Sequence, residues 1–167
     1  MKPLLILLAL SLWPARAGAE GSTLTAEKVG ACALFTAADA QRVSNVPMQF
    51  QASSLGTPGP GRTCAYRPVR ASSDRPTVEL RLLDAREWSR MKEQADASKR
   101  ALEGVTGVAD EAYVATNRSA RRAGALVLFV RRGSSQFSVR YVGAGVKLTD
   151  PMKQLARSVA GRLPAGH

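Results

Sequence analysis

Two cysteines and an excess of arginine are the residues of this 167-residue chain that could do chemistry. Cys32 and Cys64 are the only cysteines, and His167 is the only histidine. Structural zinc requires four nitrogen or sulfur ligands, and dithiol redox catalysis normally uses a Cys-x-x-Cys spacing. Neither pattern is present, so we predict no metal site and no cofactor. Pairing of Cys32 with Cys64 in a disulfide is the expected chemistry, provided that the chain enters an oxidising compartment.

The N-terminal sequence predicts that compartment. Lys2 precedes an apolar run at residues 4–13, which is too short to span a bilayer and is followed by the small residues Ala17, Gly18 and Ala19. We therefore expect residues 1–19 to be a cleaved export signal and the protein to be periplasmic, with an extracellular location as the alternative. Acylation of Cys32 as in a lipoprotein is disfavoured, because polar residues separate it from the apolar run.

The sequence contains no recognisable set of catalytic residues. Asp110 and Glu111 are adjacent carboxylates, and adjacency on a strand directs side chains to opposite faces, so we expect a role in a turn. Loop serines lack a histidine base, and a Ser-Lys arrangement with Lys147 or Lys153 stays open without a supporting motif. We assign no catalytic residue and expect a protein that is not an enzyme.

The charge is the one feature that indicates a function. Lys and Arg number 24 against 13 Asp and Glu, a net charge of +11, and arginine is suited to bidentate binding of phosphate and carboxylate. We expect an anionic partner, namely envelope lipid, polysaccharide or an acidic protein; the alternative is a merely solvated surface. Specific nucleic-acid binding is disfavoured by an aromatic content of 5%. The polyanion-binding candidates are Arg62, Arg67, Arg70, Arg118, Arg121, Arg122, Arg131, Arg132 and Arg140.

The elements that must position these arginines follow from periodicity. Alternation predicts strands at residues 48–53, 63–69, 78–82, 110–114, 125–130 and 137–141, with residues 131–135 as a hairpin loop. Helices are expected after Thr36, where Asp39 completes a capping-box pattern, from Asp84 to Leu102 with Gly104 and Gly107 ending it, and from Asp150. The last of these should bury an apolar stripe formed by Met152, Leu155, Ala156, Val159 and Leu163. The order helix, three strands, helix, three strands, helix predicts an α+β fold with a mainly antiparallel sheet of about six strands, three helices and one disulfide.

The domain organisation is simple. After the signal at residues 1–19, residues 20–30 are expected to be a mobile leader. Residues 31–164 should form a single α+β domain, and residues 165–167 a tail. No transmembrane segment is expected in the mature chain.

Four short motifs carry a family resemblance. They are Ala31-Cys32-Ala33-Leu34-Phe35-Thr36, then Cys64-x-Tyr66, then Gly107-Val108-Ala109-Asp110-Glu111-Ala112-Tyr113, and then Val130-Arg131-Arg132-Gly133. In this order they resemble uncharacterised families of small secreted bacterial proteins, including actinobacterial lipoproteins. The resemblance covers most of the mature chain, with Ala109 where the pattern has Gly and Arg132 where it has Lys. It implies a small exported α+β domain akin to the PsbP-like fold, and it implies no reaction.

Two functions follow as expectations. The first is an exported, non-enzymatic binding module whose arginine-rich face engages an anionic component of the cell envelope. The second is a protein–protein interaction or inhibitor-type domain that acts through hairpin loops near Gly59 and Gly133.

Overall fold

The structure is a computed structural model, and it describes residues 29–51, 61–70, 76–97, 102–117, 124–144 and 146–163. The expected export signal, most of the leader and the tail lie outside these residues. So do the loop around Gly59 and the three candidates Arg118, Arg121 and Arg122.

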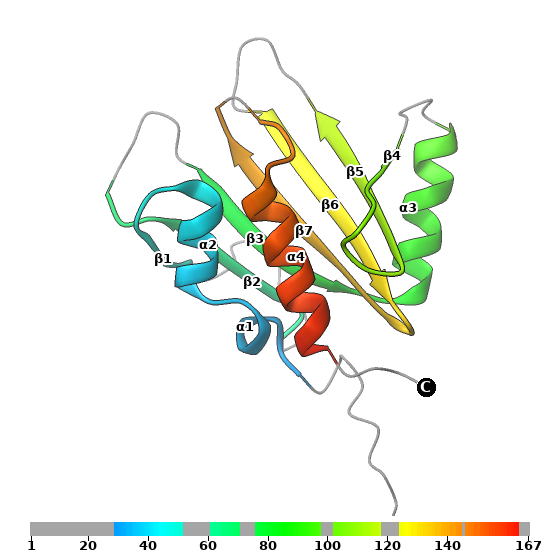
Figure 1. Cartoon of the computed structure of the whole chain (residues 1–167), viewed down its shortest axis with the longest axis horizontal. Coiled ribbons are helices and arrows are strands. Elements are labelled where there is room, and N and C mark those ends of the chain that lie inside the picture. Colours follow the sequence, from blue (N-terminus) through cyan, green and yellow to red (C-terminus); the bar gives the residue numbers. More distant parts are fainter. Residues whose placement is uncertain are drawn as a thin grey trace, which may run out of the picture.

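In the part of the chain that the structure describes, one antiparallel sheet of seven strands forms the centre of the fold (Figure 1). Its strands are β1 (Met48–Gln51), β2 (Thr63–Pro68), β3 (Thr77–Leu83), β4 (Glu103–Gly104), β5 (Glu111–Asn117), β6 (Gly124–Arg132) and β7 (Ser135–Gly143). The order across the sheet is β1-β2-β3-β7-β6-β5-β4. The chain therefore builds two antiparallel halves, which are joined where β3 pairs with β7.

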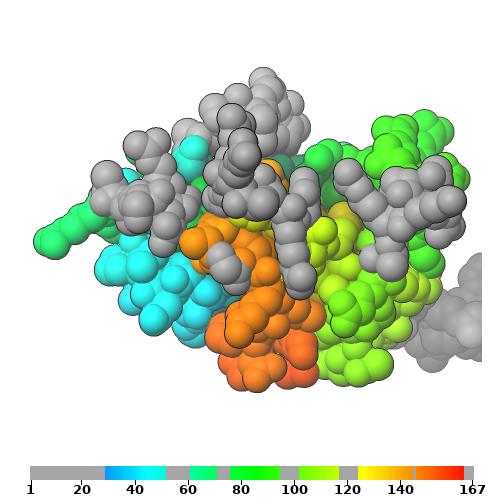
Figure 2. Space-filling model, turned by 90° about the horizontal axis from the view of Figure 1, so that it is seen from above, coloured from blue at the N-terminus to red at the C-terminus, as the bar shows by residue number. Residues whose placement is uncertain are grey.

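Four helices of the described residues accompany the sheet, so the predicted α+β class and antiparallel pairing are confirmed. They are α1 (Ala31–Leu34), α2 (Ala37–Ser44), α3 (Ala85–Ala97) and α4 (Asp150–Arg162). Figure 1 shows α1, α2 and α4 over one face of the sheet, with α3 at the right, beyond β4. Seen from above, α3 (green) and α4 (orange to red) lie on opposite sides of the molecule (Figure 2).

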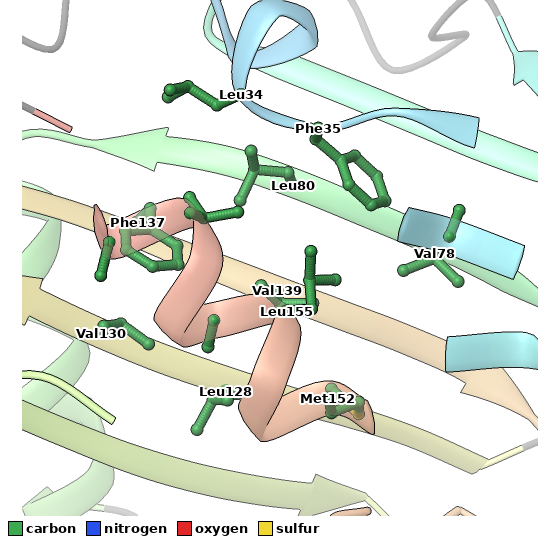
Figure 3. Close-up of a cluster of buried hydrophobic side chains, with 14 of the residues drawn as sticks. Leu34, Phe35, Val78, Leu80, Leu128, Val130, Phe137, Val139, Met152 and Leu155 are labelled. Atoms are coloured by element: carbon green, nitrogen blue, oxygen red, sulfur yellow. The ribbon is translucent and has the colours of Figure 1, made fainter. Parts of the chain in front are cut away.

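The main core lies between the sheet and α4. Apolar side chains alternate along β3 and β6, and one face of the central strands is buried at Val78, Leu80, Leu82, Leu126, Leu128, Val130, Phe137 and Val139. Figure 3 shows Met152 and Leu155 of α4 directed toward Leu128 and Val139 of the sheet. The helix stripe expected from periodicity is buried as predicted, and it comprises Met152, Leu155, Ala156, Val159 and Leu163.

Some boundaries differ from the expectations. The helix from Asp84 is described only to Ala97, and Leu102 precedes the extended β4, where Glu103 pairs with Val114. Arg131 and Arg132 belong to β6 rather than to a loop, because Gly133 takes a φ of 55° and the hairpin turns in two residues. The elements that the pattern missed, α1 and β4, are four and two residues long.

The predicted disulfide between Cys32 and Cys64 is present and fastens α1 to β2. The backbones approach closely beside it, since the N–H of Ala31 donates to the carbonyl of Gly61. A Cβ on Gly61 would lie 3.0 Å from the Cα of Gly30, and Gly61 has a φ of 97°. Glycine is thus required at this crossing for steric and conformational reasons.

A buried carboxylate ties the first helices to the last one. Asp39, only 2% exposed, completes the capping box predicted at Thr36 and also accepts hydrogen bonds from Arg42 at 3.1 Å and from Arg162 at 3.2 Å. Arg162 donates in addition to the carbonyl of Leu34 at 2.8 Å. Burial, the largest single influence, raises the pKa of Asp39, but the hydrogen bonds from Thr36 and Arg162 together leave that pKa below its ordinary value.

Removing the disulfide should destabilise the fold. We expect the Cys32→Ala/Cys64→Ala variant to lose about 3 to 4 kcal/mol of unfolding free energy, the chain-entropy value for a loop of this length. Urea unfolding of the oxidised protein and the variant measures the difference. A loss below about 1 kcal/mol would show that the contacts around Gly30 and Gly61 hold α1 on the sheet without the bond.

Removing the charge of Asp39 should destabilise the protein in a pH-dependent way. Asp39→Asn leaves Arg162 without its carboxylate, so we expect a loss of about 3 kcal/mol at neutral pH. Because the folded pKa lies below the unfolded one, the stabilisation is present above the unfolded value and is lost as pH falls through the folded value.

The gap in unfolding free energy between the wild type and Asp39→Asn should therefore narrow below about pH 4. The control is Asp150→Asn, at a carboxylate that is 88% exposed, which should stay within about 0.5 kcal/mol of the wild type. A gap that is constant between neutral and acidic pH would contradict this role of Asp39.

Candidate anion-binding face

The sheet face opposite α4 carries arginines that no described carboxylate pairs with. By the strand register, Glu79 of β3 lies between Ala65 of β2 and Arg140 of β7, and Arg140 lies next to Val127 of β6. Arg67 of β2 is directed to this same face, because it is two residues from Ala65. We call the surface formed by Arg67, Glu79, Val127, Arg140 and Val142 the arginine face.

Arg67 and Arg140 are its free cations. Both side chains are exposed, and neither forms an ion pair with a described residue. Their Cα atoms are two strands and two residues apart, about 12 Å by standard sheet spacing. Glu79 is the facing carboxylate, in register with Arg140 and half-buried. Two positive charges and one negative charge thus alternate across three strands.

Half-buried apolar side chains adjoin these charges. Val127 is in register with Arg140, and Val142 is in register with Thr77 and Ala125. The side chains of Val127, Val142, Thr77 and Ala125 are partly buried. None of these four residues belongs to the main core on the other side of the sheet. The arginine face therefore presents guanidinium groups beside aliphatic surface. This combination suits an anion with an apolar part better than an anion without one.

Two further arginines near this face already form ion pairs with carboxylates at the start of α3. Arg62 donates to Glu87 Oε2 at 2.7 Å and lies 3.5 Å from Asp84, and Arg81 donates to Glu87 Oε1. Glu87 also accepts from the N–H of Asp84, whose own carboxylate accepts from the N–H of Glu87, so the pair caps α3. The N–H of Glu87 and the charge of Arg62 hold the pKa of Asp84 below its usual value. This arrangement fastens α3 to β2 and β3.

A second ionic cluster fastens α3 to β5 and β6. Glu111 accepts from Lys92 at 3.2 Å and from Arg131. The hydrogen bond to Glu111 raises the pKa of Lys92, whose ammonium also lies 5.2 Å from the ring centre of Tyr113. Trp88 is buried against the same ring. Arg131 is thus on the side of the arginine face but is used in packing α3.

The remaining described candidates lie elsewhere. Arg132 follows Arg131 and so is directed to the opposite face, where it donates to the carbonyl of Ala160 at the end of α4. Arg70 is exposed beyond the end of β2. The structure therefore brings together Arg67 and Arg140, places Arg62 and Arg131 in ion pairs at the margin, and separates Arg132. Arg81 was not among the predicted candidates, although its alternation with Leu80 and Leu82 indicates a side chain directed away from the core.

The adjacent carboxylates have separate roles, and the expected turn role is wrong for Glu111, which lies in β5. Asp110 accepts a hydrogen bond from the N–H of Gly133 at 2.7 Å and so fixes the β6–β7 hairpin. Glu111 belongs to the cluster with Lys92 and Arg131. Within the described ranges, no three His, Cys, Asp or Glu side chains are close enough to hold a metal ion.

Comparisons with known proteins give no further assignment. The chain matches no protein-family model, no curated protein and no solved structure. Among the described helices, none has the length and apolar character needed to cross a bilayer.

The role of Glu87 can be tested directly. Glu87→Gln keeps a hydrogen-bond acceptor at the start of α3 but removes the charge that faces Arg62 and Arg81. We expect a loss of about 1 kcal/mol in unfolding free energy, a modest value because the cluster is partly exposed to solvent. The matched control is Glu93→Gln, on the exposed side of the same helix. Equal stabilities of the two variants would show that the ion pairs contribute nothing measurable.

Proposed function

We propose that this protein is an exported, non-enzymatic binding module that engages an anionic component of the cell envelope through the arginine face. The observation that carries the proposal is the presence, on one side of the sheet, of two exposed arginines that form no ion pair with a described residue and lie beside partly buried valines. Guanidinium groups bind phosphate and carboxylate bidentately, and aliphatic surface beside them accommodates the apolar part of an amphipathic anion.

The ion pairs determine which arginines are available to bind a ligand at this site. Of the described basic side chains on this side of the sheet, Arg62, Arg81, Arg131 and Lys92 are committed to Glu87 or Glu111. Arg67 and Arg140 are the arginines on the described strands of this face that can bind a carboxylate or phosphate without first losing an ion-pair partner. A compact anionic group held by these two arginines, with the net charge of +11 steering its approach, is the binding mode we propose.

Periplasmic export is part of the same proposal. A disulfide between Cys32 and Cys64 is typical of proteins that fold in an oxidising compartment. An envelope lipid headgroup or a phosphorylated polysaccharide is the partner that such a compartment offers, and an acidic protein is the other source of the same chemistry. The inhibitor-type alternative depends on the loops near Gly59 and Gly133, and the second of these is fastened at its backbone by Asp110.

The test compares two double variants of equal charge. Arg67→Gln/Arg140→Gln removes the two free arginines, and Arg86→Gln/Arg90→Gln removes two exposed arginines of α3. Binding to phosphatidylglycerol vesicles, to neutral phosphatidylcholine vesicles and to heparin is measured over a salt series. We expect the first variant to lose at least tenfold in affinity for the anionic probes and the second to lose less than threefold.

Either of two results would overturn the proposal. One is an absence of salt-sensitive binding to every anionic probe at low ionic strength. The other is an equal loss of affinity in both double variants, which would show that net charge acts without a dedicated face. Binding to vesicles alone or to heparin alone supports the face and identifies which anion it prefers.

A further inference from the structure

An uncharged stretch of sequence contains the outermost strand at one edge of the sheet. The 19 residues 43–61 contain no Asp, Glu, Lys or Arg, although 22% of the whole chain is charged. This stretch includes β1, which is the outermost strand at its end of the sheet. Outer strands present unpaired backbone N–H and C=O groups, and natural proteins commonly blunt them with charges. β1 carries no such charge.

The opposite edge is different in this respect. There the outermost strand is β4, which has two residues, one of them the exposed Glu103. A strand this short, with a carboxylate on it, offers little to a pairing strand. Of the two edges, β1 is the one whose backbone is suited to extend the sheet.

Exposed apolar side chains gather at the β1 edge. Phe50 is 58% exposed and Val69 is 53% exposed, and they are the exposed large hydrophobic residues of the described chain. Phe50 contacts Tyr66 edge to face, with ring centres 6.1 Å apart. The N–H of Val69 donates to the carbonyl of Pro47, which continues the β1–β2 pairing by one residue. By alternation, Val69 lies on the face opposite to Phe50, so apolar surface flanks this end of the sheet on both sides.

We infer that β1 pairs antiparallel with β1 of a second copy of this chain, so that two sheets continue into one across a two-fold axis. A two-fold contact places the same surface against itself, and a charged patch would then face its own charge. For a chain of net charge +11, an uncharged edge is where two copies meet with least repulsion. The Gln side chains of β1 complement one another as amides, and Phe50 loses exposed area in the contact.

The dimer is expected to be weak and to strengthen with salt. Four paired residues bury less area than a standard interface, so a reversible equilibrium is expected rather than a permanent dimer. Added salt screens repulsion between two cationic copies and so favours association. This response is opposite to that of polyanion binding by the arginine face, which salt weakens.

The experiment measures self-association of the purified protein. Sedimentation velocity over a concentration series, at low and high salt, gives the dimer dissociation constant, and hydrogen exchange over the same series reports on the amides of residues 48–51. The variant is Gln51→Lys, since Gln51 is in register with the uncharged Ala65 and the substitution places a charge on the edge strand. Its matched control is Gln154→Lys on the exposed side of α4.

We expect a dimer whose dissociation constant rises at least tenfold in Gln51→Lys and less than twofold in Gln154→Lys, with slower exchange of the β1 amides as concentration rises. A monomer at every concentration and salt would overturn the inference. So would a dimer that Gln51→Lys leaves unchanged, or one in which the β1 amides exchange at a constant rate, because association would then use another surface.

Discussion

The pairing of β3 with β7 is the constraint on which the rest of the structure depends. Seven consecutive register pairs, from Thr77 with Val142 to Leu83 with Gln136, join the N-terminal strands to the C-terminal strands. On one face this pairing aligns Leu80 with Val139 at the centre of the core. On the other face it brings Glu79 beside Arg140, and therefore creates the arginine face from segments far apart in the sequence. The pairing of β3 with β7 therefore forms both the core and the candidate site.

The helices hold that central pairing in place. α4 covers the core side of the sheet, and Arg162 near its end meets Asp39 from the beginning of the domain. The disulfide fastens α1 to β2 on the same side, whereas Glu87 and Glu111 fasten α3 on the other. Most of the carboxylates near the arginines are thus structural. Of the described arginines on the strands of the arginine face, Arg81 and Arg131 form ion pairs, and Arg67 and Arg140 remain for a ligand.

Sequence reasoning predicted the local elements well, because strong periodicity and caps mark them. The alternation of Val78, Leu80 and Leu82 identified β3, and Thr36 with Asp39 identified the start of α2. Two short elements, α1 and β4, have no periodic signal, since four and two residues are too few to show one. The extension of the α3 helix to Leu102 was wrong, because a spacing match does not reveal that the chain pairs with β5 at Glu103.

The sequence predicted a set of candidate arginines but not which of them lie on one surface. Counting arginines gave no information on which of them are free, because that depends on strand order and on partners distant in sequence. Arg131 and Arg132 are neighbours in the chain, yet one pairs with Glu111 and the other with the end of α4 on the opposite face. Arg67 and Arg140 are 73 positions apart in the numbering, and only the sheet topology places them on one surface.

The central claim is that anions bind on the face of β2, β3 and β7 opposite α4. Amide chemical-shift mapping of the ¹⁵N-labelled protein, titrated with phosphatidylglycerol bicelles at low salt, tests it most directly. We expect salt-reversible shifts centred on Arg67, Glu79 and Arg140. Shifts confined to the helix side, at residues such as Arg42 and Arg157, would contradict it.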